Sequence, residues 1–220
     1  MSKLTVEPLD LRIRDVLLRQ IMRGQLPPGF NLTETRLAEE LGASRTPLRH
    51  ALVRLEQDGF VVLEPNRGFF VSPLSADEAH ELYPILSHLE QLALRLAPPN
   101  EREVDDLKRL NAEFAATPAD DPEGAVSANF AWHERLLSGC SNRRLMTLIQ
   151  TMRDQVYRYE LAFFAPGATR LATSVDLHRS ILEALGRADV DAACARLDVH
   201  WATDLESLAP EDGTDGRGPE

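Results

Sequence analysis

A change of pattern near residue 73 constrains the fold of this chain more than any other feature. Residues 10–72 combine apolar side chains at helical spacing with two short β-rich runs, whereas the pattern from Ser75 to about Leu208 is helical throughout. The sequence therefore predicts a mainly α-helical protein with two domains, residues 1–73 and 74–208. The last stretch, residues 209–220, has no apolar anchor and is predicted to be disordered.

The first domain has the element order of a winged helix-turn-helix. Three helical stretches each end at a glycine, and the third follows a short turn in which Ser44 stands where it can cap the helix. Two β-rich runs follow, at residues 60–63 and 69–71, and a turn-forming loop at 64–68 joins them. Helix, helix, short turn, helix and β-hairpin is the order of that motif.

The third predicted helix separates basic from apolar side chains. Arg45 and Arg49 lie one turn apart on the face opposite a set of leucines. A recognition helix enters the major groove by its N-terminal end, where an arginine can bond O6 and N7 of guanine. Arg36 on the second helix could reach a flanking phosphate or base, and Arg67 at the hairpin tip could reach the minor groove. Any one of these arginines alone fits a solvated basic surface, but the four together predict DNA binding.

The charge of the chain is unevenly distributed. The net charge is −11, but residues 1–75 carry ten Lys/Arg and nine Asp/Glu, a net of +1, and residues 76–220 carry a net of −12. The acidic second part repels phosphate over a Debye length of about 8–10 Å. A DNA-binding first domain must therefore present its arginines on a face directed away from that part.

Composition favours a cytoplasmic protein without a membrane segment. No apolar run approaches the roughly 18–20 residues that cross a bilayer. The first residues lack the basic-then-apolar order of a secretory signal. The two cysteines, Cys140 and Cys194, form no metal motif and suit a reducing compartment.

The second domain is predicted to be an all-α bundle of six helices. Ser75-x-x-Glu78 and Asn100-x-x-Glu103 are capping boxes that begin the first two helices. Glycines or prolines separate four further helices, at about 125–138, 142–163, 170–186 and 189–207. The first helix is expected to bury a stripe of large apolar side chains, namely Leu82, Ile85, Leu89, Leu92 and Leu96.

Three histidines stand beside apolar stripes on three different helices of this bundle. They are His133, His178 and His200. Convergent imidazoles inside a bundle suit a divalent transition metal such as Zn, Ni, Mn or Fe. Spacing alone favours a simpler interpretation, in which each is an isolated, hydrogen-bonded histidine of the core.

The first domain closely resembles the head of GntR-family regulators over residues 10–72. The similarity rests on Ser-Arg-Thr-Pro-Leu-Arg at residues 44–49, on Leu-Ala-Glu-Glu-Leu-Gly before it and on Arg-Gly-Phe-Phe-Val in the hairpin. The resemblance implies a homodimer on a short palindromic operator in double-stranded DNA. It also implies DNA contacts from the second helix, the third helix and the wing, here assigned to Arg36, Ser44, Arg45, Thr46, Arg49, Arg67 and Gly68.

The second domain resembles, more loosely, the FCD effector domain over residues 75–208. The similar stretches are Asn-x-x-x-His at 129–133, His-x-x-Ile at 178–181 and the segment that leads to His200. In metal-binding members of this class an aspartate and three histidines hold one divalent ion, and a small carboxylate effector often completes its shell. The resemblance assigns the metal to Asn129, His133, His178 and His200. Arg158 is a candidate contact for the effector carboxylate.

Two residues depart from the FCD pattern. Asn129 stands where the class usually has aspartate, which replaces an anionic oxygen by a neutral carbonyl and weakens binding of a hard cation. Leu86 stands where an arginine is common, which removes an anion contact. The pocket could instead be metal-free, with the histidines bonding the ligand directly.

These features predict a transcription regulator, in this family most often a repressor, whose operator affinity is controlled by a small organic acid. A bound effector would change the placement of the two heads of a dimer relative to the half-site spacing. Two alternatives are a metal-responsive regulator, in which the ion is itself the signal, and a metal-dependent hydrolase. The chain shows no nucleophile motif and no paired general base, so we expect it not to be an enzyme.

Overall fold

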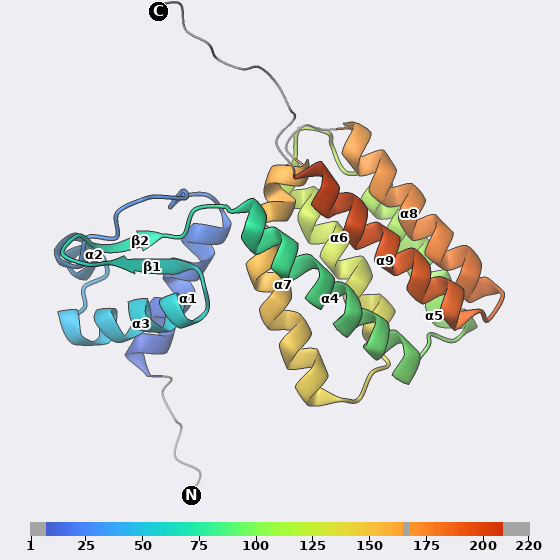
Figure 1. Ribbon diagram of the computed structural model, residues 1–220, viewed down its shortest axis with the longest axis horizontal. Coiled ribbons are helices and arrows are strands. Elements are labelled where there is room, and N and C mark those ends of the chain that lie inside the picture. Colours follow the sequence, from blue (N-terminus) through green and yellow to red (C-terminus); the bar gives the residue numbers. More distant parts are fainter. Residues whose placement is uncertain (1–7, 165–167, 209–220) are drawn as a thin grey trace, which may run out of the picture. The chain divides into compact units, whose positions relative to one another are not determined.

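The computed structural model describes residues 8–164 and 168–208, which form two compact units (Figure 1). The first unit ends at Ser75 and the second begins at Ala76. Each unit has its own apolar core. The predicted fold class, an N-terminal winged helix-turn-helix followed by an all-α bundle, is confirmed. The predicted tail, residues 209–220, lies outside the described residues.

The described part of the first unit consists of three helices and a hairpin. They are α1 (Leu9–Met22), α2 (Glu34–Glu40), α3 (Arg45–Gln57), β1 (Val61–Glu64) and β2 (Gly68–Val71). α3 packs against α1 and α2 through the apolar face predicted from its spacing. The residues of this apolar face have no exposed surface; they are Leu48, Ala51, Leu52 and Leu55. Burying a leucine contributes about 1.5–3 kcal/mol, so this face fixes which side of α3 remains open.

The hairpin is a short antiparallel ladder that ends where Glu64 pairs with Gly68. Its loop turns at Asn66, whose φ of 63° lies in the left-handed region that asparagine tolerates better than most residues. Gly68 follows with a φ of 95°, where a side chain would be strained. The turn residues of the sequence therefore set this loop, which carries Arg67 at its end.

Within the described residues the second unit is a bundle of six helices. They are α4 (Ala76–Leu96), α5 (Glu101–Ala115), α6 (Pro122–Leu137), α7 (Arg143–Phe164), α8 (Ala168–Gly186) and α9 (Val190–Ser207). α4 packs on α7 and α9, α9 also packs on α8, and α5 packs on α6 and α8. Figure 1 shows α4 flanked by α7 and α9. Trp132 and Trp201 lie in the core, and the two cysteines are buried and free.

Two predicted helix caps differ in their hydrogen bonds. The side chain of Asn100 accepts a hydrogen bond from the backbone of Glu103, whose carboxylate accepts one from the backbone of Asn100, so this capping box is confirmed. Ser44 holds the N-cap position of α3, but in the part of the chain that the structure describes its side chain makes no capping hydrogen bond. The Ser44 hydroxyl is therefore not committed to the end of the helix.

The predicted apolar stripe of α4 is wrong. Of its five members only Leu82 is buried; Leu89 is half-buried, and Ile85, Leu92 and Leu96 are 50%, 47% and 56% exposed. The helix is turned so that polar side chains enter the core. Apolar residues lie on both sides of α4, so their spacing does not distinguish the face that packs on α7 and α9 from the open face. The buried face carries Ala79, Tyr83, Leu86, Ser87, Glu90, Ala93 and Leu94 beside Leu82.

Candidate functional site

The side chains that the sequence assigns to DNA are all exposed, and Gly68 is partly exposed. They come from the start of α3, from α2 and from the hairpin loop: Ser44, Arg45, Thr46, Arg49, Arg36 and Arg67. The leucines of α3 pack into the core of the first unit, the head, so the guanidinium groups on the opposite face of α3 remain open to a ligand. A recognition helix requires this separation of a buried face from a basic one.

Polar contacts with α2 fix the guanidinium groups of α3. Arg49 lies 2.8 Å from the carboxylate of Glu34. Arg45 donates a hydrogen bond to the hydroxyl of Thr35 at 3.2 Å. Exposed pairs of this kind contribute only about 0–1 kcal/mol to stability. Their consequence is positional, because they order two long side chains on one surface.

Arginines of the head also rest on phenylalanine rings, a feature that sequence reasoning missed. A cation within about 6 Å of a ring centroid is attracted by roughly 0.5–1 kcal/mol at an exposed site. Adjacent side chains of a strand point to opposite faces, so Phe69 and Phe70 can serve an arginine of α3 and one of the loop. That dipeptide is the available sequence signal. The pairs are Arg36 over Phe30 at 5.0 Å, Arg49 over Phe69 at 5.7 Å and Arg67 over Phe70 at 4.9 Å.

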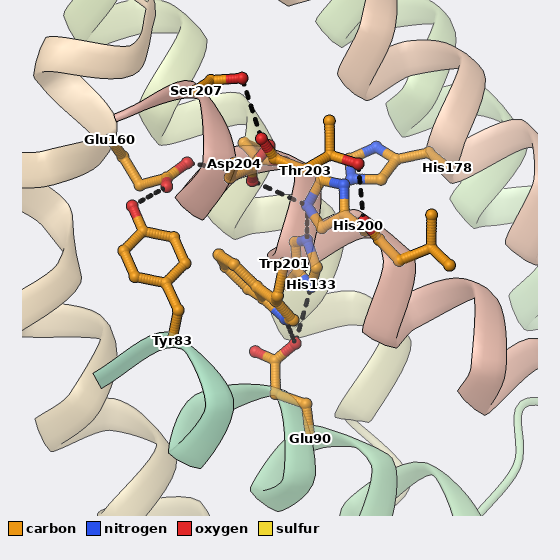
Figure 2. Close-up of polar contacts among 12 residues, drawn as sticks. Tyr83, Glu90, His133, Glu160, His178, His200, Trp201, Thr203, Asp204 and Ser207 are labelled. Atoms are coloured by element: carbon orange, nitrogen blue, oxygen red, sulfur yellow. Dashed lines mark hydrogen bonds and ion pairs between the residues drawn. The ribbon is translucent and has the colours of Figure 1, made fainter. Parts of the chain in front are cut away.

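Three histidines converge in the bundle from three helices (Figure 2). His133 of α6, His178 of α8 and His200 of α9 are fully buried, and one ligand atom of each lies within 4.8 Å of the others. The Nε2 atoms of His133 and His200 are 3.0 Å apart. Nitrogens bound to one metal ion lie about 3–3.4 Å apart, because each metal–nitrogen bond is about 2.0–2.1 Å. The structure therefore brings together the histidines that the sequence singled out.

An outer hydrogen bond orients two of these histidines. Nδ1 of His133 donates to the carboxylate of Glu90 on α4 at 2.8 Å. Nδ1 of His178 donates to Oδ1 of Asn111 on α5 at 3.1 Å, and the amide nitrogen of Asn111 donates to the carbonyl of Val175. His133 and His178 therefore each keep the Nε2 lone pair available on the side that faces the cluster. Metal-bound imidazoles have this arrangement.

Glu90 is a buried anion held by several donors. It accepts hydrogen bonds from Arg153, from His133 and from the indole of Trp201, the last at 3.0 Å. Burial alone would raise the pKa of Glu90, but the charge of Arg153 and the hydrogen bonds from Arg153 and His133 lower it to about 2. Glu90 is therefore ionised at neutral pH and compensates the charge of the buried Arg153.

Burial keeps the histidines neutral. It lowers the pKa of His133, and it lowers the pKa values of His178 and His200 well below the ordinary value, with neighbouring imidazoles acting in the same direction on the latter two. Trp132 stacks on His178 with ring centroids 3.7 Å apart and planes inclined by 6°. Neutral imidazoles present lone pairs without first losing a proton, which suits a cation.

Polar atoms without hydrogen-bond partners lie beside the histidines. Among the described residues they include Oδ1 of Asn129, Nε2 of His178, Nδ1 of His200 and both carboxylate oxygens of Asp204. A buried polar atom without a partner costs about 1–3 kcal/mol. Several such atoms together favour a cation, and imidazole nitrogen with carbonyl or carboxylate oxygen is a donor set that divalent transition metals accept. The residues present therefore fit a metal site.

Two buried carboxyl groups lie on one side of the histidines (Figure 2). Glu160 of α7 accepts from the hydroxyl of Tyr83 at 2.6 Å and from the amide of Asn129 at 3.4 Å, and burial raises its pKa to about 7. Burial, and then the charge of Glu160, raise the pKa of Asp204 well above its ordinary value. Oδ2 of Asp204 lies 3.5 Å from Nε2 of His200. Since His200 is neutral, this contact is not an ion pair.

The proposed effector contact, Arg158, is buried on α7. Burial lowers its pKa, and the charges of Glu78 and Tyr159 act in the opposite direction. Neither of those groups belongs to the histidine cluster, so Arg158 stays a prediction. Leu86 lies in the apolar core, so that position offers no contact for an anion.

Sequence reasoning missed Glu90, Asn111, Arg153 and Asp204. Each is a polar residue on the buried face of its helix. Asp204 follows His200 by four residues, which places both on one face of α9, and this spacing is a signal that could have found it. Glu90 and Arg153 come from separate helices, and nothing in their local patterns relates them.

A winged helix-turn-helix with an exposed basic face defines the first unit as the DNA-binding head of a transcriptional regulator. Residues 9–71 match the family model described as bacterial regulatory proteins, gntR family, and residues 81–203 match the FCD domain. The chain belongs to the GntR family and carries an FCD domain as its second unit. Both resemblances expected from the sequence motifs are thereby confirmed, and the family is one of transcriptional regulators.

Relatives and solved structures agree with this assignment. An HTH-type transcriptional regulator of Bacillus subtilis, YdhC, is 30% identical over 206 residues, 91% of each chain. A D-xylose utilization operon transcriptional repressor of Paenarthrobacter nicotinovorans is 27% identical and covers 96% of this chain and 94% of its own. A GntR regulator of Rhodococcus sp. RHA1 shares the fold, with a TM-score of 0.75 at 23% identity over 92% of this chain and 98% of its own. Among the described helices, none combines the length and apolarity that crossing a bilayer requires.

Proposed function

We propose that this regulator is a cytoplasmic repressor whose operator affinity is controlled by a small organic acid bound at the histidine cluster, together with a divalent transition metal. The observation that carries the proposal is the convergence of His133, His178 and His200 in a fully buried site with unpartnered lone pairs. The relative from Paenarthrobacter nicotinovorans is named as a repressor, which supports this sign of regulation.

We assign the metal, one of Zn, Ni, Mn or Fe, to Asn129 and the three histidines. A bound divalent ion supplies positive charge and an open coordination position that a carboxylate can complete. Glu90 orients His133 and Asn111 orients His178, so these two imidazoles are already turned for an ion before one binds.

At the operator we assign base contacts to the start of α3 and flanking contacts to α2 and the wing. Arg45 and Arg49 are exposed one turn apart, at the end of α3 that enters a major groove. Their guanidinium groups are suited to guanine, whereas phosphate or minor-groove contacts suit the outer positions. These outer positions are Arg36, Ser44, Thr46, Arg67 and Gly68.

We further propose that two copies of the chain meet through the open face of α4. Ile85, Leu92 and Leu96 are exposed there, and Leu89 lies between them half-buried. Their spacing of four, three and four residues places them in one row along the helix. The exposed members of this row are about half exposed, so covering one of them by a second copy contributes about half of the roughly 1.5–3 kcal/mol that full burial gives. A homodimer of this kind matches a palindromic operator.

The histidine cluster is hydrogen-bonded to α4, the helix that carries the proposed dimer face, and this contact suggests how the signal is transmitted. Glu90 of α4 bonds His133 directly, and α4 begins immediately after the head ends at Ser75. A ligand that shifts His133 would therefore also shift Glu90, and through it the helix that carries the proposed dimer face. A change in the spacing of the two heads relative to the half-sites then lowers operator affinity, typically by about 1–3 kcal/mol.

Operator titration of the full chain tests this proposal. Anisotropy is measured with chelator, with Zn²⁺ alone, and with Zn²⁺ plus each of a panel of small mono- and dicarboxylates. We expect one carboxylate class to weaken operator binding at constant metal, and His178→Ala to abolish that response. A full response to metal alone would instead identify a metal-responsive regulator. No response to any carboxylate, with or without metal, would overturn the proposal.

A further inference from the structure

The residues assigned to the metal so far include no anion. Asn129 offers a neutral carbonyl oxygen, and the three histidines are neutral imidazoles. An ion bound only by these groups would keep both positive charges in a fully buried site, which is costly unless a negative group lies close. Among the described residues, the buried carboxyl groups near the cluster are Glu90, Glu160 and Asp204.

Two of these carboxyl groups are committed to other partners. Glu90 compensates Arg153 and holds His133 from outside the cluster. Glu160 accepts hydrogen bonds on both oxygens, from Tyr83 and from Asn129. Neither is free to bind an ion without breaking these bonds.

Asp204 differs from both in having no hydrogen bond on either oxygen, as far as the described residues extend. It is fully buried and lies on α9 one turn after His200. Its Oδ2 is 3.5 Å from Nε2 of His200, close to the separation of about 3–3.4 Å expected for two atoms bound to one ion. Figure 2 shows its carboxyl group beside His200, on the side of the cluster away from Glu90.

We propose that Asp204 is the anionic metal ligand of this chain and supplies the negative charge that Asn129 lacks. The inference rests on the proposed function, because it requires a metal at the histidines. An Asn-x-x-x-His pair on α6 and a His-x-x-x-Asp pair on α9 then each offer two ligands, and His178 offers one more. The ion itself becomes the partner that the Asp204 oxygens otherwise lack. A further coordination position could then be taken by an effector oxygen.

The test moves the carboxylate from one helix to the other and measures metal affinity. Zn²⁺ binding to the full chain is determined by competition with a chromophoric chelator, for the natural sequence and for Asp204→Asn, Asn129→Asp and the double variant. We expect Asp204→Asn to weaken binding at least about tenfold. The double variant should recover to within about threefold of the natural sequence, because the carboxylate then comes from α6.

Asp198→Asn is the matched control. It makes the same chemical change on the same helix, two residues before His200, but at an exposed position that bonds Ser87. Its Zn²⁺ affinity should equal that of the natural sequence. With Co²⁺ as the probe, the visible d–d spectrum should change in Asp204→Asn and stay unchanged in Asp198→Asn, because only the first variant alters the ligand set.

The outcomes separate the two proposals. If the natural chain binds neither Zn²⁺ nor Co²⁺, the metal part of the proposed function fails and this inference fails with it. If it binds and Asp204→Asn binds equally tightly, only the role of Asp204 is overturned. Thermal melting of the metal-free variants distinguishes a lost ligand from a lost fold, and a double variant that folds but does not recover affinity also overturns the inference.

Discussion

Arg49 shows how the head holds a flexible side chain ready for recognition. Its guanidinium group pairs with Glu34 and lies over Phe69, yet 57% of the side chain remains exposed. In the proposed complex a base edge or phosphate would compete with Glu34 for the same group, and water already weakens that ion pair. Operator binding through Arg49 would then exchange one partner for another without first ordering a disordered arginine.

Arg45→Ala and Arg49→Ala are each expected to remove specific operator binding while leaving the fold intact. The loss should be about 1–3 kcal/mol for each half-site, because an exposed base contact is deleted and no core is disturbed. Anisotropy with the operator and with a scrambled duplex measures it. Arg54→Ala, on the same helix and paired with Asp10, is the control. Unchanged specificity in Arg49→Ala would contradict the assignment.

Glu90→Gln is expected to destabilise the metal-free bundle by about 3–5 kcal/mol, because it leaves Arg153 buried without a counter-charge. Urea denaturation with chelator measures the difference from the natural sequence. Since the pKa of Glu90 is lowered to about 2 in the fold, its contribution is complete above its ordinary pKa and is lost as the pH falls from there towards 2. The difference should shrink over that range; Glu81→Gln, exposed on the same helix, should show none.

At the scale of elements, α4 shows how far a helix can be predicted from its own residues. Its bounds, and those of its neighbours, follow from caps, glycines and prolines, which act locally. Its buried face does not follow, because apolar side chains lie on both sides and the choice depends on α7 and α9. The carboxylate of Glu90 can be buried because Arg153 of α7 and Trp201 of α9 donate hydrogen bonds to it.

The candidate sites also contain some features that follow from local sequence and others that depend on neighbouring elements. The exposed position of Arg45 and Arg49 could be predicted from the spacing along one helix. The convergence of His133, His178 and His200 is expected from the resemblance to the FCD domain, whereas their spacing alone favours isolated core histidines. Their supports could not be predicted, because Asn111 meets His178 across two helices and no local spacing relates them. The contact of Arg49 with Phe69 likewise joins a helix to a strand, although the Phe69-Phe70 dipeptide is a local signal that was missed.

The open face of α4 gives a prediction at this scale. Leu92→Glu is expected to convert the proposed dimer to monomers, because it places a charge in the row of apolar side chains that a second copy would cover. Sedimentation velocity measures the state, and operator affinity should fall with it. Leu63→Glu changes an exposed leucine of the wing and should leave the dimer intact. A dimeric Leu92→Glu chain would rule out this face.

At the scale of the whole molecule, stability and charge are divided between the two units. Each has its own apolar core, and the charge lies in the second, with a net of −12 over residues 76–220. A ligand that binds one unit stabilises that unit directly, by an amount that grows with the ratio of ligand concentration to Kd. The two units can therefore respond to different ligands in one experiment.

Calorimetry of the full chain is expected to show this as two transitions. Zn²⁺ at a hundredfold excess over its Kd should stabilise one of them by about 2.7 kcal/mol, and that transition should be insensitive to the metal in His178→Ala. Operator DNA should shift the other. A single transition that moves as one with either ligand would contradict independent cores.

The placement of the indoles gives an intrinsic optical probe of the histidine cluster. The chain has two tryptophans; Trp132 stacks on His178, and the ring of Trp201 lies 4.8 Å from that of His133. Intrinsic emission of the unlabelled protein therefore originates beside the histidines and not in the DNA-binding head. Candidate acids can be ranked by quenching or a wavelength shift in microplates, before any operator sequence is known.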